Sequence, residues 1–106
     1  MYQILLCDDE KQTCAELEEM ILAYARKKKT KIETGVFYTG ETLLSYLAEH
    51  PEVSILFLDI ELPQKDGVEI GKILREKLGR QDLILVYISW KQQYAMAIFQ
   101  NRPFSL

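Results

Sequence analysis

The chain has 106 residues, of which 48% are hydrophobic and 27% are charged, and this composition is typical of a single folded domain with a buried core. A formal net charge of -3 argues against non-specific binding to nucleic acid through most of the surface. This net charge does not exclude a local basic patch. No run approaches the roughly 20 apolar residues that span a bilayer, and the first residues lack the features of a signal peptide. We therefore expect a cytoplasmic protein without membrane contact.

The first part of the chain contains two predicted strands around a long helix. Residues 4–7 form a short apolar run, typical of a strand buried on both faces of a parallel sheet. Residues 11–28 repeat apolar side chains at helical spacing, and the face expected to point into the core carries Cys14, Leu17, Ile21 and Tyr24. The basic run 27–29 falls at the end of this helix, where the dipole favours cations, so we interpret it as a solvated helix end rather than a nucleic-acid contact. Residues 31–37 mix apolar and polar positions, which predicts a strand nearer the sheet edge.

The second part continues this alternation of strands and helices. Thr39 is a candidate N-cap for a helix that closes at His50 and Pro51. Residues 55–58 and 83–88 are apolar strands, separated by a helix over residues 68–78 that ends at Gly79. A short helix over residues 92–99 follows, and residues 102–106 look like the entrance to a further strand. Because parallel strands are joined by right-handed crossovers, this order predicts an α/β fold with a doubly wound parallel sheet.

Cysteine and histidine offer little support for soft-metal or histidine chemistry. Cys7 and Cys14 fall on a predicted strand and a predicted helix, with neither metal-ligand nor redox-motif spacing, so we expect reduced thiols in the core. His50 is the only histidine. A multi-histidine metal site is therefore not predicted.

Acidic residues follow two of the predicted strands. Asp8 and Asp9 come after residues 4–7, and Asp59 comes directly after residues 55–58. Ligands bind at the carboxyl ends of the strands in open parallel sheets, so we expect these acids to share one crevice. Three close carboxylates repel one another unless a cation joins them, and oxygen-only ligands with open positions favour Mg²⁺ with a phosphoryl group. A single acid after a strand is commonly just a helix N-cap, but two such positions in one short chain favour a site.

With this element order and these strand ends, the chain resembles the receiver domain of two-component response regulators. The acidic pair lies in residues 7–10, and residues 58–67 are close to the phosphoacceptor loop of the family. Ser89 stands after the fourth predicted strand, where the family carries threonine or serine. The resemblance implies a flavodoxin-like (CheY-like) fold with strand order 2-1-3-4-5, and it covers residues 1–106 as one receiver domain.

The resemblance also implies a role for each of these residues. Asp59 would be the nucleophile that takes a phosphoryl group from a phosphohistidine of a sensor histidine kinase. Asp9 would bind Mg²⁺ directly, and Asp8 would bind it through water or orient Asp9. Asp59 and the backbone carbonyl of Glu61 would complete the set of ligands. Ser89 would donate its hydroxyl to the phosphoryl group and move inward, which would switch the conformation. The domain would then be a switch with at most self-phosphorylation and autodephosphorylation activity.

The last residues suggest an output for this switch. Residues 93–99, followed by residues 102–104, resemble more narrowly receivers attached to a LytTR-type DNA-binding domain. That resemblance implies a full-length transcriptional regulator that forms a homodimer when phosphorylated. It would reach DNA only through an effector domain that is absent from residues 1–106.

Two departures from the family pattern bear on the chemistry. Trp90 stands where the family usually has a small residue, so we expect slower hydrolysis of the aspartyl phosphate. The family lysine at the end of strand five has no counterpart, since Arg102 precedes that predicted strand, and we expect the domain to be incomplete at its C-terminal end. In the loop after Asp59 we expect Asp66 to cap a helix and Gly67 to supply conformational freedom.

Three other functions compete with the phosphoacceptor switch. A receiver-like interaction module that has lost phosphorylation is favoured by the missing lysine and opposed by the acid cluster. A magnesium-dependent phosphohydrolase of the haloacid-dehalogenase type would carry a second aspartate where Glu61 stands. A flavin-binding protein of the same fold is disfavoured because an acidic loop after the first strand would repel the flavin phosphate.

Overall fold

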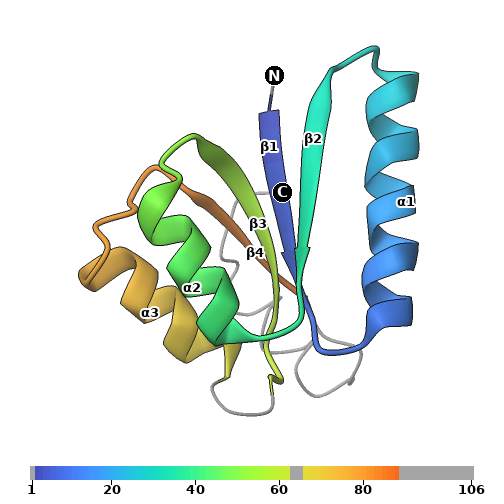
Figure 1. The fold of residues 1–106 in the computed structure, drawn as a ribbon. Coiled ribbons are helices and arrows are strands. Elements are labelled where there is room, and N and C mark those ends of the chain that lie inside the picture. The colour runs from blue at the N-terminus through green and yellow to red at the C-terminus, as the bar shows by residue number, and fades with distance from the viewer. Residues whose placement is uncertain (1, 63–65, 89–106) are drawn as a thin grey trace.

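The computed structural model describes residues 2–62 and 66–88, in which four parallel strands alternate with three helices (Figure 1). None of the helices in these ranges has the length and apolar character needed to cross a membrane. The elements are β1 (Tyr2–Cys7), α1 (Lys11–Lys27), β2 (Ile32–Phe37), α2 (Gly40–Glu49), β3 (Val53–Asp59), α3 (Gly67–Glu76) and β4 (Ile84–Ile88).

The sheet is parallel and has the strand order β2-β1-β3-β4. The prediction of a doubly wound, flavodoxin-like α/β fold is confirmed, and β2 lies at the edge as its mixed pattern indicated. The chain reverses direction across the sheet after β2, so right-handed crossovers put α1 on one face and α2 with α3 on the other (Figure 1). The predicted helix over 92–99 and the predicted fifth strand lie outside the described residues, as do Ser89 and Trp90.

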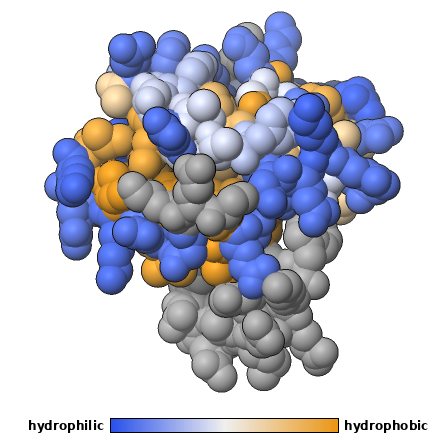
Figure 2. All heavy atoms as spheres, turned by 60° about the horizontal axis from the view of Figure 1, so that its bottom comes forward, coloured by the Kyte–Doolittle hydropathy of each residue, from blue (hydrophilic) through white to orange (hydrophobic). Residues whose placement is uncertain are grey.

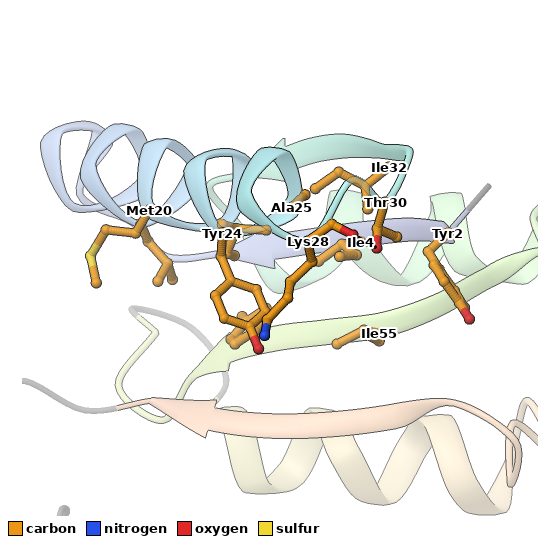
Figure 3. Close-up of a pocket in the computed structure, with 12 residues that line it drawn as sticks. Tyr2, Ile4, Met20, Tyr24, Ala25, Lys28, Thr30, Ile32 and Ile55 are labelled. Atoms are coloured by element: carbon orange, nitrogen blue, oxygen red, sulfur yellow. Dashed lines mark hydrogen bonds between the residues drawn. The ribbon is translucent and has the colours of Figure 1, made fainter.

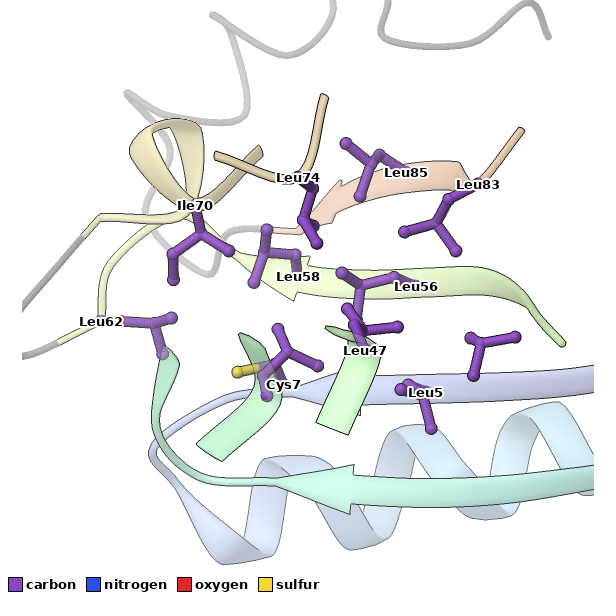
Figure 4. Packing of buried hydrophobic residues seen from close by; sticks show 12 residues of the cluster. Leu5, Cys7, Leu47, Leu56, Leu58, Leu62, Ile70, Leu74, Leu83 and Leu85 are labelled. Atoms are coloured by element: carbon purple, nitrogen blue, oxygen red, sulfur yellow. The ribbon is translucent and has the colours of Figure 1, made fainter. Parts of the chain in front are cut away.

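The main core lies between the sheet and the pair α2 and α3 (Figure 4). Alternate residues of each strand point to this face of the sheet, and the strand residues that do so are apolar. From the strands come Leu5, Cys7, Val53, Leu56, Leu58 and Leu85, with Leu83 just before β4, and from the helices and the loop come Leu43, Leu47, Ile70, Leu74 and Leu62.

On the other face, the orientation of α1 differs from the prediction. Cys14 and Ala25 face the sheet and are buried, while Leu17 and Ile21 are half-buried. Tyr24, predicted to point inward, is 64% exposed. Successive helical residues are rotated by roughly 100°, so burial of Ala25 turns Tyr24 away from β1 and β2.

Side chains fix the beginning of two helices, as the sequence indicated. The Thr39 hydroxyl accepts a hydrogen bond of 3.2 Å from the Thr42 backbone N–H at the start of α2. The Asp66 carboxylate accepts one of 2.8 Å from the Glu69 N–H at the start of α3. Each bond satisfies a backbone donor that has no partner within the first turn of its helix. After α3, Gly79 adopts the left-handed conformation (φ 64°) expected of a glycine that ends a helix.

Arg80 is a buried cation that the sequence pattern did not reveal. Its guanidinium donates to four backbone carbonyls, the shortest being that of Val53 at 2.8 Å, and the others are Leu47, His50 and Pro51. An outer contact of 3.4 Å joins it to the exposed carboxylate of Asp82. Arg80 therefore ties the segment after α3 to the end of α2 and the beginning of β3.

Candidate functional site

The register of β1 and β3 brings the acidic residues together. Cys7 pairs with Leu58, so Asp8 and Asp59 follow at the same level on adjacent strands. The structure places carboxylate oxygens of Asp8, Asp9 and Asp59 within 4.8 Å of one another. Asp8 and Asp59 are only 3% and 6% exposed, whereas Asp9 is exposed. The site thus has two buried carboxylates and one that opens to solvent.

Backbone N–H groups hold the two buried carboxylates in place. An oxygen of Asp8 accepts a 2.9 Å hydrogen bond from the N–H of Glu10. An oxygen of Asp59 accepts a 3.1 Å bond from the N–H of Glu61. Each acid therefore bonds to the backbone two residues further along, a turn that fixes the carboxylate orientation at the strand end.

The electrostatic environment makes Asp59 an unusual acid. Burial raises its pKa from 3.8 to about 6, and the negative charges of Asp8 and Asp9 act in the same direction. The hydrogen bond from Glu61 works against this rise because it stabilises the carboxylate. At neutral pH Asp59 is mostly ionised, and its charge lies beside two further carboxylates at the strand ends. A cation bound there would relieve this repulsion.

The ligands available at this point are those of a hard cation. Cys7 and Cys14 are buried close by, but burial raises the pKa of their thiols to about 12 and about 11, so neither supplies a thiolate near neutral pH. These thiols instead contact backbone carbonyls, Cys7 that of Thr39 at 3.6 Å and Cys14 that of Asp8 at 3.4 Å. Carboxylate oxygens without thiolate or imidazole suit Mg²⁺, Ca²⁺ or Mn²⁺ rather than Zn²⁺. The acid cluster therefore fits the predicted magnesium site.

The beginning of α3 lies close to the end of β3 at Gly67. The N–H of Gly67 donates a 2.7 Å hydrogen bond to the carbonyl of Ile60. Gly67 is the first residue of α3, and among the glycines of the described residues it is Gly79 that has a positive φ. What Gly67 provides is space: a Cβ there would collide with the backbone of Asp59 and Ile60.

The acid cluster lies on the face of the molecule where the strands end. Figure 2 turns this face toward the viewer and shows hydrophilic residues along much of its outer edge. Of the predicted site residues, Asp8, Asp9 and Asp59 meet here, Glu61 follows two residues after Asp59, and Ser89 lies outside the described residues. The arrangement places the buried carboxylate of Asp59 beside two others, and the three could together hold a metal ion.

Comparison with known proteins identifies the family. The sequence model for the response regulator receiver domain matches residues 4–101. The chain is 24% identical over 97 residues to the sensory transduction protein LytT of Oceanobacillus iheyensis, covering 92% of this chain and 37% of that protein. It is also 24% identical over 102 residues to stress response regulator protein 1 of Lodderomyces elongisporus, covering 94% of this chain and 26% of that protein. The chain thus spans well under half the length of these relatives.

Solved structures share the fold. A sensor protein from Polaromonas sp. JS666 superimposes with a TM-score of 0.72 at 24% identity, covering 96% of this chain and 76% of that one. The CheX-CheY-BeF3-Mg²⁺ complex from Borrelia burgdorferi contains a chain that matches with a TM-score of 0.71 at 22% identity, covering 93% of this chain and 71% of that one. At these sequence identities the structural similarity establishes the fold alone. Family membership is established by the family model, which spans most of the sequence. The chain belongs to the response regulator receiver domain family, whose members are switches in phosphorelay signalling.

Proposed function

We propose that Asp59 accepts a phosphoryl group from a phosphohistidine of a sensor histidine kinase, in a reaction that depends on Mg²⁺. The observation that carries this proposal is the buried Asp59 carboxylate at the end of β3, within 4.8 Å of the oxygens of Asp8 and Asp9. A buried carboxylate surrounded by others is costly as a purely structural element. It is well suited to a site that binds a cation and a phosphoryl group.

The chemistry requires little more than a positioned nucleophile. An Asp59 carboxylate oxygen attacks phosphorus, the P–N bond of the phosphohistidine breaks, and the imidazole nitrogen keeps the electron pair and takes up a proton. The Glu61 N–H holds one Asp59 oxygen, which fixes the direction from which the other approaches. Asp8, Asp9, Asp59 and the backbone carbonyl of Glu61 would hold Mg²⁺. When bound, the cation offsets the negative charge of the phosphoryl oxygens.

The consequence of phosphorylation is a change of conformation in a cytoplasmic regulator. Ser89 would donate its hydroxyl to the new phosphoryl oxygens and thereby move the segment that follows β4. Residues 1–106 would form one receiver domain, and the similarity to LytT supports a LytTR-type DNA-binding output domain in a longer protein. In that protein, phosphorylation would favour a homodimer, and DNA would be contacted only by the output domain.

The test is mass spectrometry of the intact chain and its peptides after incubation with Mg²⁺ and phosphoramidate. We expect one phosphoryl group per chain, located on Asp59 and absent from Asp59→Asn. Asp82→Asn is the matched control, because Asp82 is an exposed aspartate outside the acid cluster. Failure to label the wild-type chain, or equal labelling of Asp59→Asn, would contradict the proposal. Many turnovers of a phosphoester per chain would point to a hydrolase instead.

A further inference from the structure

Lys11 places a positive charge at the end of α1 where a cation is unfavourable. It is the first residue of the helix, and the first turn contains no acidic residue. The N-terminal end of a helix carries a partial positive charge, so a cation there lowers the stability of the helix. The residue is also exposed to solvent. Stabilisation of α1 therefore does not account for Lys11.

The side chain of Lys11 lies over an aromatic ring. Its ammonium is 5.6 Å from the centre of the Tyr38 ring, which is within the range of a cation–π interaction. The nearest acid in the sequence, Glu10, instead accepts a 3.3 Å hydrogen bond from the Thr13 hydroxyl. The ion pairs found among the described residues do not include Lys11. Its charge is thus available to an anion that approaches from solvent.

A second lysine lies over a tyrosine ring at the other end of α1, and that pair has a local explanation. The Lys28 ammonium is 5.7 Å from the centre of the Tyr24 ring, and Figure 3 shows the two side chains extending side by side. The residues are four apart, at the end of the helix where the dipole favours cations. Neither reason applies to Lys11 and Tyr38, which come from different parts of the chain.

Lys11 and Tyr38 lie beside the acid cluster. The Asp8 N–H donates a 3.0 Å hydrogen bond to the carbonyl of Phe37, so Tyr38 and Asp8 follow neighbouring strands. The order β2-β1-β3 then separates Tyr38 from Asp59 by two strand spacings. With strands about 5 Å apart, the charge of Lys11 lies on the order of 10 Å from Asp59. Figure 1 shows α1 beginning at this same edge of the sheet.

We propose that Lys11, held by Tyr38 at the rim of the acid cluster, attracts the anionic phosphodonor toward Asp59. This inference rests on the proposed function, because it concerns the same phosphoryl transfer. The carboxylates of the cluster repel a negatively charged donor. An exposed cation at the rim offsets this repulsion and raises the local concentration of the anion. The same cation opposes the binding of Mg²⁺, because both are positive.

The rate of Asp59 labelling by acetyl phosphate, followed by intact mass spectrometry at saturating Mg²⁺, tests the attraction. At low ionic strength Lys11→Gln should slow labelling about threefold. In roughly 0.5 M NaCl the difference should fall below about twofold, because the Debye length is then shorter than the separation of about 10 Å. Phosphoramidate is less negatively charged at neutral pH, so its labelling rate should fall less.

Mg²⁺ affinity separates an electrostatic role of Lys11 from a structural one. Isothermal titration calorimetry with Mg²⁺ should show binding to Lys11→Gln that is about threefold tighter than to wild type at low ionic strength. A variant that distorts the acid cluster would bind Mg²⁺ more weakly and also label more slowly. Lys11→Arg keeps the charge and should match wild type in both measurements.

Variants of Tyr38 test whether the ring holds the cation. Tyr38→Phe keeps the aromatic face and should be labelled as fast as wild type. Tyr38→Leu removes that face and should slow labelling by acetyl phosphate. If the ring acts through Lys11, Tyr38→Leu should have no further effect when it is combined with Lys11→Gln.

Lys28→Gln is the matched control. It removes a lysine with the same kind of ring contact, roughly 25 Å away along α1, and should match wild type in labelling and in Mg²⁺ affinity. A wild-type chain that is not labelled would refute the proposed function and this inference with it. A labelled wild type with an equally fast Lys11→Gln would overturn this inference alone. So would weaker Mg²⁺ binding by Lys11→Gln, or a loss of rate that is the same at low and high salt.

Discussion

A Cβ added to Gly67 would lie 2.3 Å from the carbonyl oxygen of Asp59 and 2.9 Å from the Cα of Ile60. The first turn of α3 therefore packs directly on the backbone that carries the proposed phosphoacceptor. Both obstructing atoms belong to the main chain, so they cannot move aside by a change of rotamer. The position of α3 and the position of Asp59 are consequently coupled.

This contact predicts the effect of Gly67→Ala. The added methyl group must displace either α3 or the end of β3, which should reduce the free energy of unfolding by about 2 kcal/mol. It should also slow phosphoryl labelling of Asp59 several-fold, because the carboxylate shifts with its backbone. Urea unfolding and time-resolved mass spectrometry measure the two effects. Lys72→Ala, at an exposed position of α3, is the control and should leave both unchanged.

The raised pKa of Asp59 predicts a pH-dependent stability in the absence of divalent cations. Its folded value of about 6 exceeds the ordinary 3.8, so the folded chain binds more protons than the unfolded chain between these two values. The stabilising contribution of protonated Asp59 is complete below about pH 4 and is lost as the pH rises through the folded value. Asp59→Asn should therefore raise the free energy of unfolding by about 2 kcal/mol at neutral pH. The gain should vanish in acid.

Unfolding of both proteins by urea at a series of pH values checks this prediction. Glu49→Gln removes a carboxylate that is exposed and should shift stability little at any pH. An Asp59→Asn gain that is equally large at low and neutral pH would show that packing, and not charge, is responsible.

Mg²⁺ should stabilise the chain near neutral pH. Binding to the folded state alone adds about 1.4 kcal/mol when the free cation reaches ten times its Kd. Asp9→Ala should abolish this gain without harming the fold, because Asp9 is exposed yet contributes an oxygen to the acid cluster. Thermal unfolding with and without Mg²⁺, at ionic strength matched with NaCl, provides the measurement. If Asp9→Ala and Glu49→Ala respond to Mg²⁺ alike, the acid cluster is not the binding site.

Arg80 predicts a stability effect that leaves the site intact. Arg80→Ala removes the donor shared by the carbonyls of Leu47, His50, Pro51 and Val53 and should cost about 3 kcal/mol. Lys77→Ala, at an exposed position just after α3, should cost little. Because the acids sit at the opposite end of β3, the stabilisation by Mg²⁺ should be the same in both variants. A selective loss of that stabilisation in Arg80→Ala would contradict this separation.

The parallel sheet and the clustering of Asp8, Asp9 and Asp59 could be predicted because both depend on local sequence patterns. Apolar runs of strand length, alternating with helical periodicity, determine the parallel order, and parallel strands necessarily end at one edge. Thr39 and Asp66 were also recognisable as N-caps, since capping needs only the residue itself and the next turn. The edge position of β2 followed from its mixed polarity in the same way.

Features that depend on contacts between residues far apart in the chain could not be predicted from the sequence. Arg80 looks like an ordinary loop cation, and its burial depends on carbonyls 27 to 33 positions earlier in the chain. Tyr24 fits the apolar repeat of α1, but the rotation of the helix is decided by which neighbours fit against β1 and β2. Gly67 was recognisable as a residue of a loop or helix start, but its close approach to the backbone of Asp59 and Ile60 leaves no signal in local propensity.

Alkylation of Cys7 and Cys14 can measure local unfolding of this chain without an added label. The two thiols are 0% and 2% exposed, and burial raises both pKa values far above neutrality. An alkylating reagent reacts with thiolate, so it must wait until the structure around β1 and the start of α1 opens. The rate of alkylation of the wild-type chain would therefore measure how often this region unfolds locally. Because Cys7 and Cys14 lie on either side of Asp8 and Asp9 in the sequence, this rate would report local unfolding next to the acid cluster.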